Sequence, residues 1–256
     1  MVSRVLKNSI FLRIYAGLVV LVVVVAAFCY LLVQVINYQR AQEYREYLTD
    51  GISYVISEGV SRQPQKQQKL DWISDASDLL ELPIYYVDAA RVELSRTEKK
   101  RIAEQKSVVR YDANNGVGYI IIGLKDDAKH YLYIKVDKLG ERQMKALPIF
   151  VLDYLIFYPG QEREYLERIK KHFYYPITIA NIKDINLDSE QIGRLRQDQS
   201  ILLYKDSATV RGTTISIVSP MPNHPAQVLI LGPVPMFNWM PFQLSAGITL
   251  FSLFLL

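Results

Sequence analysis

The amino-acid sequence predicts an α+β fold in which two tandem modules lie between two transmembrane helices. Three observations support this prediction: an uncharged run at residues 14–36, a second apolar run at residues 237–256, and an internal repeat in which residues 72–112 align with residues 165–205. The chain has 256 residues, of which 50% are hydrophobic. This length suffices for two ordinary domains, or for one domain together with membrane segments.

The first apolar run, IYAGLVVLVVVVAAFCYLLVQVI, extends over 23 residues without a charge. At about 1.5 Å per residue, a helix of this length crosses a hydrocarbon layer of about 30 Å with some tilt. A cleaved signal peptide has a shorter apolar core that ends at a small-residue cleavage site. Here the run continues through Leu31, Leu32 and Val33 into Gln34, so we expect an uncleaved transmembrane helix.

The charges that flank this run predict its orientation. Arg4, Lys7 and Arg13 precede it without any acid, and the positive-inside rule therefore places the N-terminus in the cytoplasm. Residues 37–236 then lie outside and hold the other 27 Lys and Arg (30 − 3) and all 26 acids. These charges nearly cancel and form no basic stripe, so they give no reason to expect nucleic-acid binding. A bacterial inner-membrane protein with a periplasmic domain fits this layout best.

The C-terminal apolar run predicts a second transmembrane helix. Trp239 lies at its start, where interfacial aromatic residues anchor membrane helices, and Pro241 lies in the first turn, where its missing N–H costs little. The 20 residues at 237–256 just suffice to cross the membrane. The only cysteine, Cys29, lies in the first apolar run, so we expect the outer region to hold together without a disulfide.

The outer region contains an internal repeat at an offset of 93 residues. Pro83 and Ile84 fall on Pro176 and Ile177, and the segment SVVRYD lies over SILLYK. The same alignment pairs Arg101 with Arg194, Ser107 with Ser200, and Tyr111 with Tyr204. In each copy the order of signals is helix, strand, helix and three strands. This order favours an antiparallel sheet flanked by helices, a sensor-like α+β module.

Local signals support the elements of each copy. In the first copy, residues 71–81 have helical spacing, and Ser95 with Glu98 forms a capping box for the next helix. In the second copy, Asp188 and Gln191 occupy the corresponding cap positions. Runs rich in Ile, Val and Tyr, separated by turn residues, predict the strands that complete each sheet.

These boundaries divide the chain into six segments. They are a cytoplasmic stub at 1–13, transmembrane helix 1 at 14–36, a membrane-proximal helix at 37–66, module 1 at 67–140, module 2 at 141–235, and transmembrane helix 2 at 236–256. Within module 2, residues 144–159 predict a buried helix, because their apolar core is too short to span a membrane. A re-entrant segment is the alternative for this stretch.

The membrane-proximal helix carries a narrow apolar stripe formed by Tyr44, Leu48, Gly51 and Val55. Steps of four, three and four residues place these side chains on one face, as in a coiled-coil seam. Two interpretations are open. The stripe packs on the sheet of its own chain, or it pairs with the same helix of a second subunit. The second interpretation predicts a homodimer.

The outer region shows no catalytic constellation. His130, His172 and His224 lack metal-binding spacing, and we expect neither a metal site nor a catalytic residue. His172 ends an amphipathic helix, where a cation suits the helix dipole. The acidic pairs Asp126-Asp127 and Glu162/Glu164 are interpreted as solvated.

Two tyrosine pairs lie near matching strands of the two copies. Tyr85-Tyr86 and Tyr174-Tyr175 flank the corresponding strands of the two copies. Paired aromatic residues at a strand end either pack in the core or at the sheet edge, or they line a ligand pocket. The composition favours packing, and the identity of any ligand stays unknown.

The stretch QVLILGPVPMFNWMPFQLSAGITLFSLFLL resembles the last sensor strand and second membrane helix of RstB-like and BfmS-like bacterial two-component sensor histidine kinases. In these proteins an aliphatic strand ends in G-P-V-P and a membrane helix follows at once. The N-terminal stretch SIFLRIYAGLVVLVVVVAAFCYLLVQ is similar to their basic stub and first helix. The resemblance covers both ends and residues 165–235, whereas the first module is an extra copy.

This resemblance implies a dimeric membrane receptor in signal transduction that detects a periplasmic ligand or protein. It also implies a cytoplasmic linker, a phospho-accepting histidine, an ATP-binding domain and a cognate response regulator. No motif for these parts occurs in the 256 residues, so the cofactor ATP is expected only in a missing kinase domain. The chain is therefore expected to be the sensory part of a longer protein, with Gly232, Pro233 and Pro235 coupling the last strand to the second span.

Three alternatives to a kinase output stay open. The same periplasmic modules also suit a chemoreceptor or a cyclic-dinucleotide enzyme. A two-span interaction protein with no output domain is a further possibility. An enzyme tethered at both ends lacks a visible nucleophile or metal set.

Overall fold

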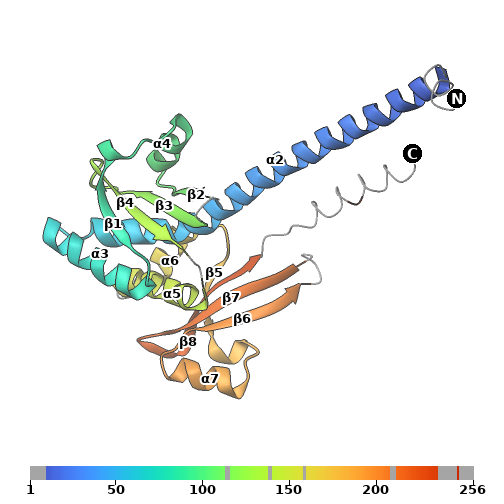
Figure 1. Ribbon diagram of the computed structural model, residues 1–256. Helices are drawn as coiled ribbons and strands as arrows, with labels where there is room; N and C mark the ends of the chain where they lie inside the picture. Colours follow the sequence, from blue (N-terminus) through green and yellow to red (C-terminus); the bar gives the residue numbers. More distant parts are fainter. Residues whose placement is uncertain are drawn as a thin grey trace. The chain divides into compact units, whose positions relative to one another are not determined.

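Among the residues that it describes, the computed structural model has an α+β fold with six α-helices and two four-stranded antiparallel sheets (Figure 1). The described residues are 10–112, 116–137, 140–157, 160–207, 212–235 and 247. By internal contacts the chain divides into two compact units, Met1–Glu43 with Phe237–Leu256, and Tyr44–Met236. The first unit is described mainly by the start of helix α2, and the second contains both sheets.

Helix α2 (Ile10–Ser61) is a single helix of 52 residues. Its most apolar 18-residue window has a mean hydropathy of 3.0 and is not buried in the chain. Among the described residues, α2 is the one helix long and apolar enough to cross a membrane. The predicted first span and membrane-proximal helix therefore belong to one unbroken helix. The predicted second span, residues 236–256, lies almost wholly outside the described residues.

From α3 in module 1 and from α6 in module 2, the two modules have the same order of elements. Module 1 comprises α3 (Lys66–Leu80), β1 (Ile84–Asp88), the 3-10 helix η1 (Ala89–Arg91), α4 (Arg96–Ala103), β2 (Val108–Asp112), β3 (Val117–Gly123) and β4 (His130–Val136). Module 2 comprises α5 (Glu141–Ile156), α6 (Glu162–Lys170), β5 (Ile177–Asn181), η2 (Ile182–Asp184), α7 (Ser189–Arg196), β6 (Ile201–Ser207), β7 (Gly212–Met221) and β8 (His224–Pro235). The predicted order of helix, strand, helix and three strands is confirmed in both.

The predicted offset of 93 residues holds at the level of single elements. Strands β1 and β5, helices α4 and α7, and the starts of β2 and β6 each differ by 93 in residue number. The sheet orders, β1-β4-β3-β2 and β5-β8-β7-β6, are also identical. The same offset relates the C-terminal part of α2, from Leu48, to α5, which begins at Glu141. Each module therefore begins with an equivalent long helix.

Helix caps form where the sequence predicts them. The Ser95 hydroxyl accepts a hydrogen bond from the Glu98 N–H at 3.3 Å, and the Glu98 carboxylate accepts one from the Ser95 N–H at 2.7 Å. Asp188 and Gln191 form the same reciprocal pair, at 2.8 and 3.0 Å. These caps fix the starts of α4 and α7, the crossover helices, at equivalent points.

One hydrophobic core extends through both modules. It includes Ile56 and Val60 from α2, Leu132 from β4, Leu155 from α5, and Leu231 from β8. A second, smaller cluster in module 2 forms around Leu195, Ile201, Val218 and Val228. Since the larger core crosses the boundary between the copies, the two modules fold as one unit.

Helix α5, which ends at Ile156, confirms the buried helix predicted at 144–159, of which positions 158 and 159 lie outside the described residues. It packs on β7 and β8, and Phe150, Val151, Leu152 and Leu155 are buried. Pro148 lies inside this helix.

Two glycines of α2 provide space for large aromatic side chains. A Cβ atom on Gly51 would lie 2.3 Å from the Phe173 ring, and one on Gly59 would lie 2.4 Å from the Trp72 ring. Phe173 belongs to module 2 and Trp72 to α3 of module 1. Since real Cβ contacts are longer, glycine is required for both rings to lie against the helix backbone.

We predict that Gly51→Ala and Gly59→Ala each destabilise the fold by about 1–3 kcal/mol, because the added methyl overpacks a filled site. The matched control is Gly193→Ala in α7, where a Cβ meets nothing within 4 Å. Alanine there should stabilise the protein by up to about 1 kcal/mol through helix propensity. Thermal unfolding of the full chain in detergent measures all three variants, and equal midpoints would contradict the close packing of both rings.

Candidate functional site

Helix α2 is held on one side by a buried ion pair to module 1. Arg101 Nη2 lies 3.0 Å from Asp50 Oδ1 and 3.1 Å from Asp50 Oδ2, and Arg101 Nη1 lies 3.2 Å from Glu46 Oε2. The side chains of Asp50, Glu46 and Arg101 are 10%, 15% and 18% exposed. Charges at this depth require partners, because each would otherwise lose its hydration without compensation.

Hydrogen bonds from Ser107, which directly precedes β2, and from Thr49 of α2 complete this network. Asp50 Oδ1 accepts bonds at 2.9 Å from both the N–H and the hydroxyl of Ser107, which is fully buried. The hydroxyls of Thr49 and Ser107 lie 2.8 Å apart. Arg101 Nε donates to the Ser107 carbonyl at 2.9 Å. Both oxygens of Asp50 are therefore occupied, and the network ties α2 to the turn between α4 and β2.

The local sequence explains how this turn reaches α2. Arg101 lies in the last turn of α4, and Gln105 adopts a left-handed conformation with φ of 58°. The backbone N–H of Lys106 then returns to the Arg101 carbonyl at 3.0 Å. This tight reversal brings Ser107 beside Arg101 on the same acceptor, Asp50.

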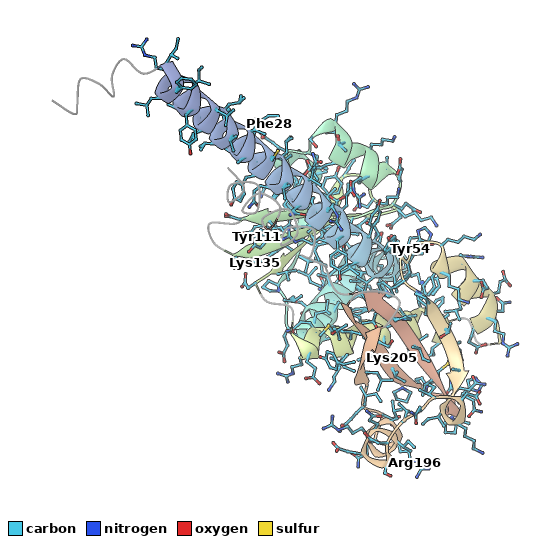
Figure 2. All side chains as sticks on the ribbon, turned by 90° about the vertical axis from the view of Figure 1, so that its right-hand side faces the viewer. Phe28, Tyr54, Tyr111, Lys135, Arg196 and Lys205 are labelled. Atoms are coloured by element: carbon cyan, nitrogen blue, oxygen red, sulfur yellow. The ribbon has the colours of Figure 1, made fainter. Side chains whose placement is uncertain are left out.

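Module 2 grips the same helix through three consecutive aromatic residues, His172, Phe173 and Tyr174, which we call the aromatic clasp. The His172 ring stacks on Tyr54 with centroids 3.6 Å apart, and the Tyr174 ring stacks on Tyr47 with centroids 4.8 Å apart. Between them, Phe173 lies against Gly51. Tyr54, on α2, is labelled in Figure 2.

The aromatic clasp matches the helical period of α2. Residues 47, 51 and 54 follow steps of four and three, so they lie on one face of the helix. The clasp residues follow one another in the turn and bend between α6 and β5. Three adjacent side chains therefore engage successive turns of the helix.

His172 is held neutral by its place in the clasp. Burial lowers the pKa of His172 from its ordinary value, and Lys125 and Lys171 lower it further against the opposing effect of Glu58 and Asp50. The sequence predicted a cation here because the residue follows a helix C-terminus. Burial outweighs the opposing effect of Glu58 and Asp50 on the pKa, so the ring acts as an aromatic surface rather than as a charge.

A shallow depression of about 190 Å³ lies between the Asp50–Arg101 ion pair and the aromatic clasp. It is lined by Tyr47 and Asp50 of α2, by residues 104–106 of module 1, and by residues 171–174 of module 2. Asp50 belongs to the buried ion pair, and residues 172–174 are the clasp. A molecule in this depression would therefore touch both groups of residues that hold α2.

A second polar cluster connects α3 with the turn between β3 and β4. Lys69 forms an ion pair with Asp126, and Asp127 accepts hydrogen bonds from Tyr86 and from His130, the latter at 2.8 Å. Burial opposes ionisation of Asp127, but these two hydrogen bonds prevail and its pKa is lowered. The interpretation of this acidic pair as solvated is therefore wrong.

The other predicted features have definite places. Glu162 and Glu164 are at the surface, where Glu164 lies 3.8 Å from Arg168. Tyr86 and Tyr175 pack on or in the core, whereas Tyr85 is exposed and Tyr174 lines the depression. Thus one member of each tyrosine pair is a packing residue.

The stripe of α2 packs within its own chain. Val55 and Gly51 are buried, Leu48 packs against the main core, and Tyr44 is partly buried, with a pKa that burial raises. The interpretation that the stripe packs within its own chain therefore holds for Gly51 and Val55, whose surfaces are covered by residues of the same subunit. The homodimer stays a prediction, because Tyr44 and Leu48 keep part of their surface exposed.

The coupling segment Gly232, Pro233 and Pro235 belongs to β8 rather than to a linker after it. Ile215 pairs with Val234, and Ile217 pairs with Leu231, so β8 carries an extra residue at this point. Gly232 has φ of 121°, and a Cβ there would lie 2.7 Å from the Ile215 carbonyl oxygen. Glycine is required because the bulge brings the two backbones together.

Among the described residues, no three His, Cys, Asp or Glu side chains come together as a metal-binding group. A scan of protein-family models found no match to this sequence. A search of curated proteins also found none.

We predict that Arg101→Met destabilises the protein by about 3–5 kcal/mol, because Asp50 then remains buried without its partner. Arg194, the equivalent residue of module 2, forms only an exposed pair with Glu190 at 3.2 Å. Arg194→Met is the matched control and should change stability by less than about 1 kcal/mol. The double variant Asp50→Asn with Arg101→Met should recover part of the loss in thermal unfolding; equal effects of the two arginine variants would refute the role of the buried pair.

Proposed function

We propose that this chain is the sensory input region of a membrane-bound two-component histidine kinase of a bacterial inner membrane. In this proposal the unit Tyr44–Met236 lies in the periplasm and detects a ligand or a partner protein. The signal then reaches the cytoplasm through the apolar segments at 14–36 and 237–256. The resemblance of both ends of the chain to RstB-like and BfmS-like sensors supports the kinase output.

The observation that carries this proposal is the continuity of α2. One helix begins in the apolar run and ends in the core of the folded unit, where Val60 is fully buried. No loop separates the apolar run of α2 from the part that packs in the folded unit. In this proposal, a rotation or shift of the packed part therefore passes along the helix. Both modules hold this helix, one through Asp50 and Arg101 and the other through the aromatic clasp.

A second path for the signal runs through β8. This strand is central in its sheet, because it pairs with both β5 and β7, and it ends at Pro235, immediately before the second apolar run. Two prolines within four residues limit the backbone freedom at this junction. Displacement of the sheet would therefore move the segment that follows. A sensor of this kind shifts between two packings when a ligand favours one of them.

A receptor with another output, such as a chemoreceptor or a cyclic-dinucleotide enzyme, is the alternative. It uses the same folded unit and the same two routes. A homodimer and a cognate response regulator belong to the kinase proposal and follow from the resemblance. The folded unit itself does not discriminate between output domains.

The reading frame beyond codon 256 provides the first test of the output. The kinase proposal predicts that coding continues into a basic linker and then a helix with an H-E-x-x-x-P type phospho-acceptor motif. Sequencing the gene gives this result directly. A stop codon at this point, or a domain of another class, would reject the kinase output while leaving the sensory role to be tested separately.

Helix insertions test transmission through α2. Two alanines inserted after Gln42 rotate the two parts of the helix by about 200°, whereas seven added residues leave them about 20° out of phase. We predict that the two-residue insertion abolishes the stimulus-dependent output of the full-length protein and that the seven-residue insertion retains it.

The insertion point lies outside the unit Tyr44–Met236, so the thermal unfolding of that unit should not change in either variant. This measurement separates a loss of coupling from a loss of folding. A normal stimulus response with the two-residue insertion would show that the phase of α2 does not carry the signal.

A further inference from the structure

His172 is the one residue of the aromatic clasp whose side chain can gain a proton near neutral pH. Its ring lies flat on Tyr54 of α2, with centroids 3.6 Å apart and ring planes 8° apart. The side chain is only partly buried and lines the depression beside the clasp, so solvent protons can reach it. A charge gained by this ring is therefore gained at the contact that joins module 2 to α2.

Charged groups from several elements surround the stacked pair. Asp50 and Glu58 of α2, Lys125 of the β3–β4 turn and Lys171 of the same segment face the His172 ring. Arg62 and Arg168 face its partner, Tyr54. Glu104 and Lys106, after α4, line the same depression and lie 2.7 Å apart.

The carboxylates in this set already have cationic partners. Asp50 accepts bonds from Arg101 and Ser107 on both of its oxygens, and Glu58 Oε1 lies 3.2 Å from Lys125 Nζ. A protonated His172 would therefore add a positive charge for which no carboxylate is left. Burial lowers the pKa of His172, and the lysines add to this effect against that of Glu58 and Asp50.

Protonation of His172 and closure of the clasp oppose each other. In an open clasp the ring is solvated and its pKa returns to an ordinary value of about 6.5. Because the pKa is lower in the closed clasp, the closed form is most stable above that pH. Its stability falls as the pH drops below about 6.5, where the open form takes up the proton more readily.

The position of His172 in the chain extends its effect to the whole clasp. Phe173, in the space that Gly51 leaves, and Tyr174, on Tyr47, are the next two residues. A shift of the His172 ring away from Tyr54 therefore acts on both neighbouring contacts. The network that joins α2 to module 1 contains no histidine, so acid acts on one of the two contacts that hold the helix.

We propose that the aromatic clasp is an acid-sensitive contact, in which a proton on His172 separates its ring from Tyr54 and loosens module 2 from α2. The pair of Asp50 and Arg101 keeps α2 attached to module 1. The inference rests on the proposed sensory function, because it names mild acid outside the membrane as a condition that shifts α2 between two packings.

An NMR titration of the unaltered full chain in lipid nanodiscs tests the proton site directly. The chain has three histidines, and single His→Phe variants assign their ring signals. The His172 signal should titrate with a midpoint below about 6.5. A midpoint at or above that value would overturn the proposal, because attraction between the charged ring and Tyr54 would then exceed the cost of burial.

Hydrogen exchange measures the clasp itself, with His172→Phe and His224→Phe as a matched pair. His224, at the start of β8, is exposed. Between about pH 7.5 and about pH 5.5, exchange at residues 172–176, corrected for its intrinsic pH dependence, should rise by about twofold or more in the unaltered chain. The rise should persist in His224→Phe and vanish in His172→Phe, which keeps a ring that does not titrate.

Residues 101–107 provide the internal reference, because they hold α2 from module 1. Their exchange should not change over the same pH range. The unfolding midpoint at about pH 7.5 shows whether His172→Phe is folded. An equal rise in both phenylalanine variants, or an equal rise at residues 101–107, would reject His172 as the cause.

These measurements follow the clasp alone, whereas the insertions in α2 follow transmission. A clasp unaffected by acid, together with the expected insertion result, would reject the acid-sensitive contact and retain the sensory function. A clasp that loosens in acid, together with a normal response after the two-residue insertion, would retain the contact and reject transmission through α2.

Discussion

The buried ion pair between Asp50 and Arg101 fixes how α2 sits on the folded unit. Apolar contacts alone allow a helix to slide or rotate, because many apolar pairings have similar free energies. A charge network is different, because any shift in register leaves Asp50 or Arg101 buried without its partner. Such a loss costs several kcal/mol. Thus one pair sets the rotation of the part of α2 that lies within the unit Tyr44–Met236.

Module 2 fixes the same helix by shape rather than by charge. Phe173 occupies the space that Gly51 leaves, while His172 and Tyr174 stack on the flanking tyrosines. Rotation of α2 would move Gly51 away from the Phe173 ring and Asp50 away from Arg101 at once. The two grips are therefore linked through the helix, and close-packed contacts of this kind switch between discrete arrangements rather than deform continuously.

The sequence repeat predicted the order of elements because each copy carries the same local signals at a fixed offset. The capping boxes at Ser95 and Asp188 placed α4 and α7 correctly, since a cap depends only on residues three apart. The partner of the α2 stripe was not predictable in this way. Periodicity shows that Gly51 and Val55 share a face, but it does not show whether the same chain or a second subunit covers that face.

The candidate site was predicted only in fragments. Tyr174 was recognised as a possible pocket residue, but Asp50 and Arg101 are 51 positions apart and neither has a local pattern that predicts burial. His172 was assigned a charge from its position after a helix, although burial against Tyr54 keeps it neutral. Each of these features depends on packing between distant segments, for which a single sequence has no local signal.

The comparison of the two modules separates what the fold needs from what α2 needs. At the offset of 93 residues, Asp50 corresponds to Gln143 and Arg101 to Arg194, and Arg194 forms only an exposed pair. Module 2 nevertheless forms the same sheet in the same order. The buried pair is thus not a requirement of the module fold. It occurs in the copy whose first helix continues from the apolar run, which supports a role in holding and orienting that helix.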